Sequence, residues 1–181
     1  MPRAAVVAIP LRDEAKRIGG CLAALSRQSV PADHVVLLLN NCRDGTAEVV
    51  KATPKAAHRL HVVECELKGS SASAGVARGL AMNYSASLID DGVLLTTDAD
   101  AEVPENWIEA NLRAIEEGSD AVCGKAVSTR SKPCSSRAIY TRMMLTKWPT
   151  GGCLTRSDQS SFRILQTRGH ATAKTQAPAL P

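Results

Sequence analysis

Short apolar segments that alternate with helical patterns constrain the fold of this chain more than any other feature. The apolar runs occupy residues 4–10, 34–40, 60–65, 93–97 and 120–127. Continuous apolar runs of this length are typical of strands that are buried on both faces. Strands that alternate with helices form a mostly parallel sheet with right-handed crossovers. The sequence therefore predicts an α/β protein whose parallel strands are flanked by helices.

The segments between the apolar runs carry helical spacing. We expect helices over residues 13–28, 46–52 and 76–88, and a fourth helix that begins near Pro104 and ends at Gly118. Proline suits the first turn of a helix, and glycine is the preferred residue just after the last turn. Each pair of successive strands is thus joined by a segment long enough for a crossover.

Composition places limits on the class of protein. The 181 residues suffice for one domain of ordinary size, and aromatic residues make up only 3% of them. No apolar run approaches the roughly 18 residues of a membrane span, and the start of the chain does not resemble a secretory signal. The six cysteines are scattered without a C-x-x-C pair, which favours reduced thiols over disulfides or a zinc site. We expect a cytoplasmic protein without an integral membrane segment.

Charge divides the chain in two. Residues 1–127 hold 13 basic and 17 acidic residues, whereas residues 128–181 hold the remaining nine basic and one acidic. Residues 128–181 have no regular spacing of aromatic residues. Their only helical pattern is a short one at 138–148, and they have no strand pattern. We therefore predict an α/β domain over 1–127 and a basic, poorly ordered tail over 128–181. A basic tail can bind nucleic acid, but this one is better explained as a solvated segment.

Asp98 and Asp100 are the strongest candidates for chemistry. They follow the apolar strand 93–97 directly and precede the helix that begins near Pro104. In an extended segment, side chains two residues apart point the same way, so the two carboxylates should converge. A hard divalent cation such as Mg²⁺ or Mn²⁺ relieves their repulsion and also binds a diphosphate. The alternative is a solvated acidic loop.

Three turns should share one edge of the sheet, because each follows a parallel strand. They span residues 10–14, 40–44 and 98–100. Ligands of such sheets bind beyond the carboxyl ends of the strands. No G-x-G-x-x-G or Walker motif is present in the sequence, which disfavours a dehydrogenase or a P-loop enzyme.

Four motifs together resemble family 2 glycosyltransferases of the GT-A fold. VVAIPLRDE resembles their opening strand, LNNCRDGT their second-strand turn, SAGVARGLAMN their Gly/Arg-rich segment, and LLTTDADAEVPENWI their D-x-D strand and following helix. The matches keep the order and spacing of the family over about residues 4–127. The resemblance implies a Rossmann-like GT-A sheet and transfer of a sugar from a nucleoside-diphosphate-sugar donor to an acceptor that the sequence does not identify.

The resemblance also implies roles for individual residues. Asp100 would bind the metal directly, and Asp98 would contact the ribose or help to hold the metal. Arg78 would lie near the donor phosphates, where a guanidinium suits a pyrophosphate. The nucleotide pocket would be lined by Pro10, Arg12, Glu14, Asn41 and Asp44.

Two of these roles have alternatives that the sequence leaves open. Asn41 stands where the family usually has an aspartate that faces the base, and an amide there carries no charge. Asp44 can equally form an Asx-turn that only shapes the loop before Gly45.

Other polar and aromatic residues are better explained without a role in the site. Glu102 is better explained as an acid at a helix entry, Trp107 as core or cleft wall, and the four histidines as structural or solvated residues.

The sequence does not supply a general base for an inverting transfer. In the family this carboxylate lies well after the D-x-D, and only Asp158 follows residue 127 here. We therefore hypothesise a truncated or frame-shifted transferase in which residues 128–181 are a non-native extension. Two further alternatives stay open: a non-catalytic fragment that at most binds a nucleotide or nucleotide-sugar, and a nucleotidyltransferase.

Overall fold

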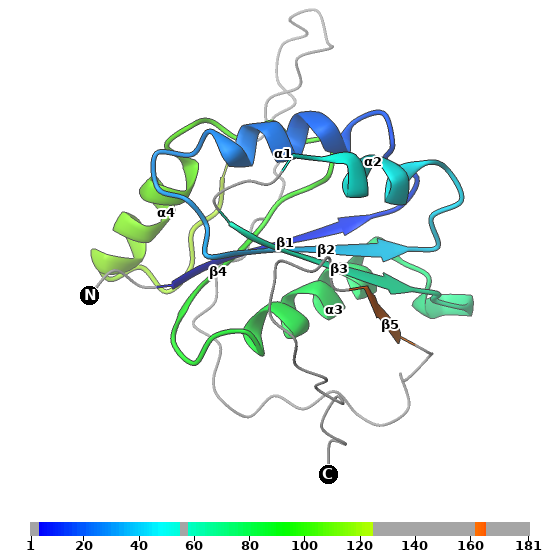
Figure 1. Cartoon of the computed structure of the whole chain (residues 1–181). Coiled ribbons are helices and arrows are strands. Elements are labelled where there is room, and N and C mark those ends of the chain that lie inside the picture. Colours follow the sequence, from blue (N-terminus) through cyan, green and yellow to red (C-terminus); the bar gives the residue numbers. More distant parts are fainter. Residues whose placement is uncertain (1–3, 55–57, 125–161, 166–181) are drawn as a thin grey trace, which may run out of the picture.

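The computed structural model describes residues 4–54, 58–124 and 162–165. Strands and helices alternate along most of the chain (Figure 1). The strands are β1 (Ala4–Leu11), β2 (His34–Asn40), β3 (Arg59–Cys65), β4 (Gly92–Thr96) and β5 (Phe162–Leu165). The helices are α1 (Ile18–Ser26), α2 (Thr46–Ala52), the short 3₁₀ turn η1 (Gly69–Ser71), α3 (Ala74–Ala86) and α4 (Trp107–Glu116).

The strands form one sheet in the order β4-β1-β2-β3-β5. The first four run parallel, and β5 pairs antiparallel with β3. β1 is an interior strand, since Ala8 pairs with Val36 of β2 on one side and with Thr96 of β4 on the other. The predicted α/β class with mostly parallel strands is confirmed.

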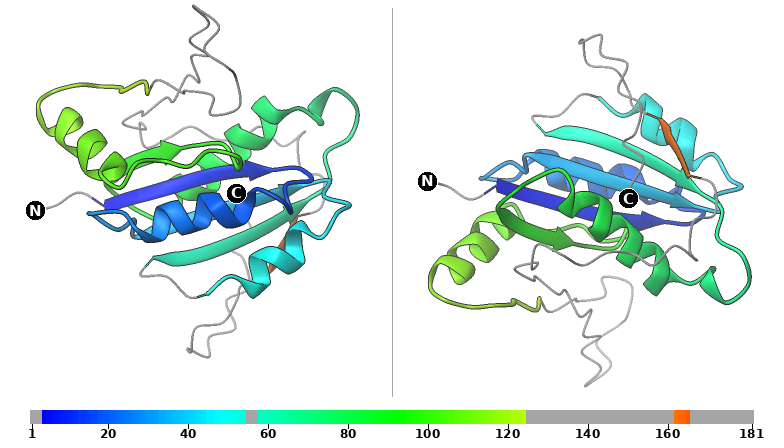
Figure 2. Two further views of the ribbon diagram at one scale, coloured as in Figure 1. Left: turned by 90° about the horizontal axis from the view of Figure 1, so that it is seen from above. Right: turned by 90° about the horizontal axis from the view of Figure 1, so that it is seen from below.

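Helices cover both faces of the sheet. α1 and α2 lie on one face and α3 on the other (Figures 1 and 2). Side chains such as Val7 and Ile9 form a core with α1 and with Trp107 and Ile108 of α4. Residues of the opposite parity, such as Ala8, pack against α3. Because both faces are covered, Ala5–Ile9 of β1 are all buried, and this explains why the strand has no polar alternation.

The largest differences from the predicted bounds are at the start of α1 and in residues 120–127. α1 begins at Ile18 rather than Asp13, because Asp13 adopts a left-handed conformation (φ 55°) that cannot continue into a helix. α4 ends before Gly118, whose φ of 101° fits the predicted helix stop. The predicted strand over 120–127 is wrong for residues 121–124, which are described without a strand, and residues 125–127 lie outside the described part.

The segment predicted as a tail contributes to the sheet. Within residues 128–181 the structure describes β5, which pairs with the last four residues of β3. The expected short helix at 138–148 lies outside the described residues. In the described part of the chain, no helix combines the length and the apolarity that crossing a bilayer requires.

A histidine pair lies on the α3 side of the sheet, near the amino ends of the strands. His34 Nδ1 and His61 Nε2 are 2.8 Å apart, and the His61 ring lies edge-on to Tyr84 of α3. Burial lowers the pKa of both imidazoles below 6.5; Arg59 adds to the effect on both, while Asp33 opposes it at His34. One ring must stay unprotonated to accept the hydrogen bond of the other.

This pair predicts an acid-sensitive fold. The unfolded chain takes up protons as the pH falls below about 6.5, whereas the folded imidazoles take them up only at lower pH. The free energy of unfolding should therefore decline between about pH 7.5 and 5.5. Urea titrations across this range should show a shallower decline for His61→Gln. Tyr84→Phe keeps both imidazoles and should retain the wild-type slope; an unchanged slope in His61→Gln would contradict the assignment.

Candidate functional site

The carboxyl ends of β1, β2 and β4 meet at one edge of the sheet, as the parallel arrangement requires. The chain leaves them through residues 12–17, 41–45 and 97–102. α3 begins at this same edge, because it follows the carboxyl end of β3. All the predicted site residues therefore lie at this edge or on the elements that border it.

Asp13 ties the first two loops together. Its Oδ1 accepts hydrogen bonds from the backbone nitrogens of Arg43 (2.7 Å) and Asp44 (3.3 Å). The left-handed backbone of Asp13 is one of the conformations that aspartate tolerates better than most residues. Sequence reasoning did not assign a role to Asp13; its only signal was a place in the same turn.

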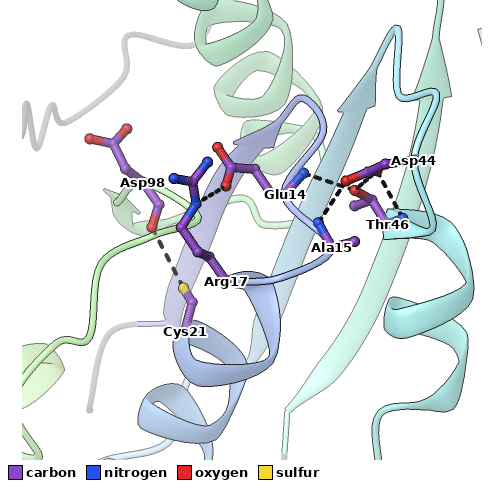
Figure 3. A network of polar contacts seen from close by, with 7 residues as sticks. All are labelled: Glu14, Ala15, Arg17, Cys21, Asp44, Thr46 and Asp98. Atoms are coloured by element: carbon purple, nitrogen blue, oxygen red, sulfur yellow. Dashed lines mark hydrogen bonds and ion pairs between the residues drawn. The ribbon is translucent and has the colours of Figure 1, made fainter.

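Thr46 and Asp44 make the second tie between these loops (Figure 3). The buried Thr46 hydroxyl accepts a hydrogen bond from the Glu14 backbone nitrogen at 2.9 Å and donates to Asp44 Oδ1. Asp44 Oδ2 accepts from the Ala15 nitrogen at 3.0 Å, and Asp44 Oδ1 accepts from the Thr46 nitrogen at 3.0 Å. The hydrogen bond from the Thr46 hydroxyl is the main cause of the lowered pKa of Asp44.

This geometry is the Asx-turn that the sequence offered as one alternative for Asp44. The carboxylate hydrogen-bonds the backbone two residues on, and it also holds the β1–α1 loop. The backbone nitrogens that it satisfies lie at the end of a sheet, where they have no ladder partner. Asp44 therefore has a structural role here.

Asn41 also binds backbone. Its Nδ2 donates to the Leu67 carbonyl at 3.1 Å, and its Oδ1 accepts from the Leu67 nitrogen at 2.9 Å. With its φ of 54°, the residue joins the end of β2 to the segment that follows β3. The amide retains one N–H and one lone pair for a further contact.

Asp98 and Asp100 lie on a turn and not on an extended segment. The Ala101 nitrogen donates to the Asp98 carbonyl at 3.1 Å, which closes the turn. The expectation that Asp98 and Asp100 lie in an extended segment is therefore wrong. The Asp98 side chain is 40% exposed and pairs with Arg78, whereas Asp100 is exposed.

The Arg78–Asp98 ion pair joins α3 to this turn. A terminal guanidinium nitrogen of Arg78 donates to Asp98 Oδ1, and the Arg78 side chain is 29% exposed. The Nε of Arg78 is buried and has no hydrogen-bond partner among the described residues. Two residues that the sequence assigned to phosphate and metal thus contact each other directly.

The first turn of α1 contacts the turn that contains Asp98. The Cys21 thiol donates to the Asp98 carbonyl at 3.6 Å (Figure 3). Burial raises the pKa of this thiol to about 12, with smaller contributions from Asp100, Asp98 and Glu102. A Cβ on Gly20 would lie 3.0 Å from Glu102 Oε1. Glu102 therefore lies against α1 and not at the entry of α4.

Arg17 is a charged residue of this edge that sequence reasoning missed. Its Nε donates to Glu14 Oε2 at 2.6 Å (Figure 3). Glu14 raises the pKa of Arg17, and Asp100 makes a smaller contribution of the same sign. Of the other predicted residues, Pro10 is half-buried within β1 and Arg12 is exposed in the loop that follows.

The carboxylates at this edge fit a divalent cation of the Mg²⁺ type. The described residues contain no group of three or more His, Cys, Asp or Glu side chains arranged to hold a metal. Mg²⁺ does not need one, since it binds through one or two carboxylates together with substrate phosphates and water. Asp98 and Asp100 can supply those carboxylates, provided that Asp98 gives up Arg78.

Comparison with known proteins identifies the family. The model of glycosyl transferase family 2 matches residues 6–167. The chain belongs to this family. The chain is also 31% identical to Glycosyltransferase AglE of Haloferax volcanii over 127 residues. These aligned residues make up 68% of this chain and 39% of AglE.

Solved structures support the same fold. Residues 1–349 of TarS from S. aureus superpose with a TM-score of 0.59 at 20% identity, covering 74% of this chain and 38% of TarS 1–349. TarS 1–349 in complex with UDP-GlcNAc gives 0.57 at 23% identity, over 73% and 37%. The predicted GT-A-like sheet is confirmed, and the chain spans well under half the length of these relatives.

The family match extends beyond residue 127, where we placed the end of the domain. It includes β5 and stops two residues after it. The division into 1–127 and 128–181, and the truncation hypothesis that depends on it, stay predictions.

Replacing Thr46 should loosen the two loops. Thr46→Val keeps the shape of the side chain but leaves the Glu14 nitrogen without its acceptor and removes the hydroxyl donor to Asp44. We expect a loss of about 1–3 kcal/mol in the free energy of unfolding, measured by urea titration. Thr46→Ser keeps the hydroxyl and should lose clearly less; equal losses in the two variants would show that packing, not the hydroxyl, decides the effect.

Proposed function

We propose that the chain binds a nucleoside-diphosphate-sugar donor together with Mg²⁺ or Mn²⁺ and transfers the sugar to an acceptor. The observation that carries the proposal is the contact of Arg78 with Asp98 at the carboxyl edge of the sheet. It brings a guanidinium, which suits a pyrophosphate, to the carboxylates that suit a divalent cation. Membership of glycosyl transferase family 2 supports sugar transfer as the reaction class.

Different elements of the fold would bind different parts of the donor. Asp98 and Asp100 on the turn after β4 would hold the cation, with Asp98 also within reach of the ribose. Arg78 on α3 would bind the diphosphate. The nucleoside side of the pocket would be lined by Pro10, Arg12, Glu14, Asn41 and Asp44. Asn41 and Asp44 would act mainly by fixing the loops, since their polar atoms already bind backbone.

The bound cation would neutralise the charge that develops on the leaving nucleoside diphosphate. The protein's own contribution is to fix the positions of the groups around it. The buried Cys21 thiol holds the backbone of the Asp98 turn, and the loop ties at Thr46 and Asp13 hold the neighbouring loops. Groups that are positioned before the ligand arrives do not have to be reorganised during the reaction.

TarS has been solved with UDP and with UDP-GlcNAc, which makes uridine nucleotides the first donors to test. We assign no general base: Asp158, the one acidic residue after residue 127, lies outside the described part of the chain. Donor binding without transfer is therefore the second outcome that the experiment must detect.

Calorimetric titration tests the donor site. UDP, GDP and a panel of UDP- and GDP-sugars are titrated into the protein with and without Mn²⁺, and into Asp100→Ala. We expect nucleotide binding that depends on Mn²⁺ in the wild type and is at least tenfold weaker in the variant, because the cation loses one of two carboxylates. Donor hydrolysis or transfer in the same samples separates a transferase from a binding fragment.

Asp91→Ala is the matched control. Asp91 is an exposed aspartate at the other end of β4, immediately before Gly92, so its loss removes the same charge without touching the turn. Equal affinities of the two variants, or nucleotide binding that ignores Mn²⁺, would argue against the metal site. Tighter binding of UTP or CTP than of any diphosphate would favour a nucleotidyltransferase.

A further inference from the structure

The partner of Asp98 in this structure is a side chain of the protein itself. Arg78 lies in the second turn of α3 and reaches across to the turn after β4. Both side chains are only partly exposed, so the attraction between them is screened less than that of a fully exposed pair. The carboxylate that a cation would need is thus already neutralised.

The hydrogen bond to Asp98 leaves one donor of this guanidinium unused. Its Nε is buried and unpartnered among the described residues, although every other hydrogen-bonding capacity of the guanidinium can be met by Asp98 or solvent. A guanidinium whose Nε and terminal nitrogen both face one oxyanion binds it with two parallel hydrogen bonds. With Asp98 alone, the structure shows one such bond.

The turn itself is short of positive charge. Asp98 and Asp100 lie on this turn, and both, together with Glu102, lie near enough to the Cys21 thiol to raise its pKa. The other guanidinium nearby, that of Arg17, is engaged with Glu14. If Arg78 left Asp98 and nothing replaced it, the turn would carry uncompensated like charges at close range.

We propose that Arg78 is the internal counter-cation of Asp98 and is exchanged for the divalent cation when the donor binds. The exchange rests on the donor function proposed above: the guanidinium moves from Asp98 to the diphosphate as the metal takes the carboxylate. A cation that binds alone has to displace Arg78 from Asp98, and a diphosphate that binds alone is repelled by the carboxylates of the turn. When both bind, the diphosphate accepts the displaced Arg78 and the cation neutralises the carboxylates. The affinities for the two ligands are therefore coupled.

The exchange predicts opposite effects of one substitution on the two ligands. In Arg78→Gln, Mn²⁺ alone, counted by the EPR signal of the free ion, should bind on the order of tenfold more tightly than in the wild type. UDP or GDP in saturating Mn²⁺ should bind on the order of tenfold more weakly. Arg78→Lys keeps the charge and should bind Mn²⁺ as weakly as the wild type.

Two controls make the result specific. Arg113→Gln removes a helical arginine that is paired with Glu117 on α4, and it should leave Mn²⁺ binding unchanged. Adding Asp98→Asn to Arg78→Gln should abolish the gain in Mn²⁺ affinity, because the gain requires the freed carboxylate. If circular dichroism shows that Arg78→Gln is unfolded, the measurement is repeated on Arg78→Met, which also removes the positive charge.

The outcomes separate this proposal from the donor function. Mn²⁺ binding that is no tighter in folded Arg78→Gln or Arg78→Met than in the wild type overturns the counter-cation role, even if the wild type binds nucleotide. Tighter Mn²⁺ binding by these variants, in a protein that binds no nucleotide under any condition, supports the competition at Asp98 and removes the donor function instead.

Discussion

The parallel pairing of β1 with β2 and β4 is the constraint on which the rest of the structure depends. Because the three strands run in the same direction, the loops that follow them emerge at one edge. The buried Ala5–Ile9 segment lies between two layers of helices, so its side chains pack into a core on each face of the sheet. A site assembled from residues far apart in the sequence is therefore held by the most buried part of the core.

The edge where these loops meet creates a second requirement. Backbone nitrogens beyond the last ladder pair need acceptors, and this chain supplies them from Asp13, Asn41, Asp44 and Thr46. Each of these side chains binds the backbone of a different loop from its own. The loops consequently hold one another, and they do not depend on a ligand to be placed.

The sequence predicted the elements whose signals are local. The bounds of β2 and α2 match the predicted ones, because an apolar run and a turn with Gly45 determine them within a few residues. β5 could not be predicted, since its four residues become a strand by pairing with β3 about 100 residues earlier. Residues 121–124 have a strand-like composition and form no strand, which shows that composition alone does not supply a pairing partner.

The predicted site residues lie at one edge of the sheet or on the elements that border it, as expected for loops that follow parallel strands, but their contacts were beyond sequence reasoning. The period-two rule assumed that Asp98 and Asp100 lie in an extended segment, whereas they lie on a turn that the Ala101 nitrogen closes. The partner of Asp98 comes from a helix 20 residues earlier, and only the packing of α3 on the sheet determines that contact. Arg17 resembled any other surface arginine until the loop before α1 brought it to Glu14.

The hydrogen-bonding capacity that remains at this edge indicates where a ligand can act. The side chains of Asn41, Asp44 and Thr46 all bind backbone atoms of neighbouring loops, so the β2 side of the edge is mainly scaffold. The β4 and α3 side differs, because Asp100 is exposed and the buried Nε of Arg78 has no described partner. A buried donor without an acceptor is costly unless a ligand or water supplies one. An anion bound beside a cation would supply what both residues lack, and for this reason the donor site proposed above has its charged part on this side of the edge.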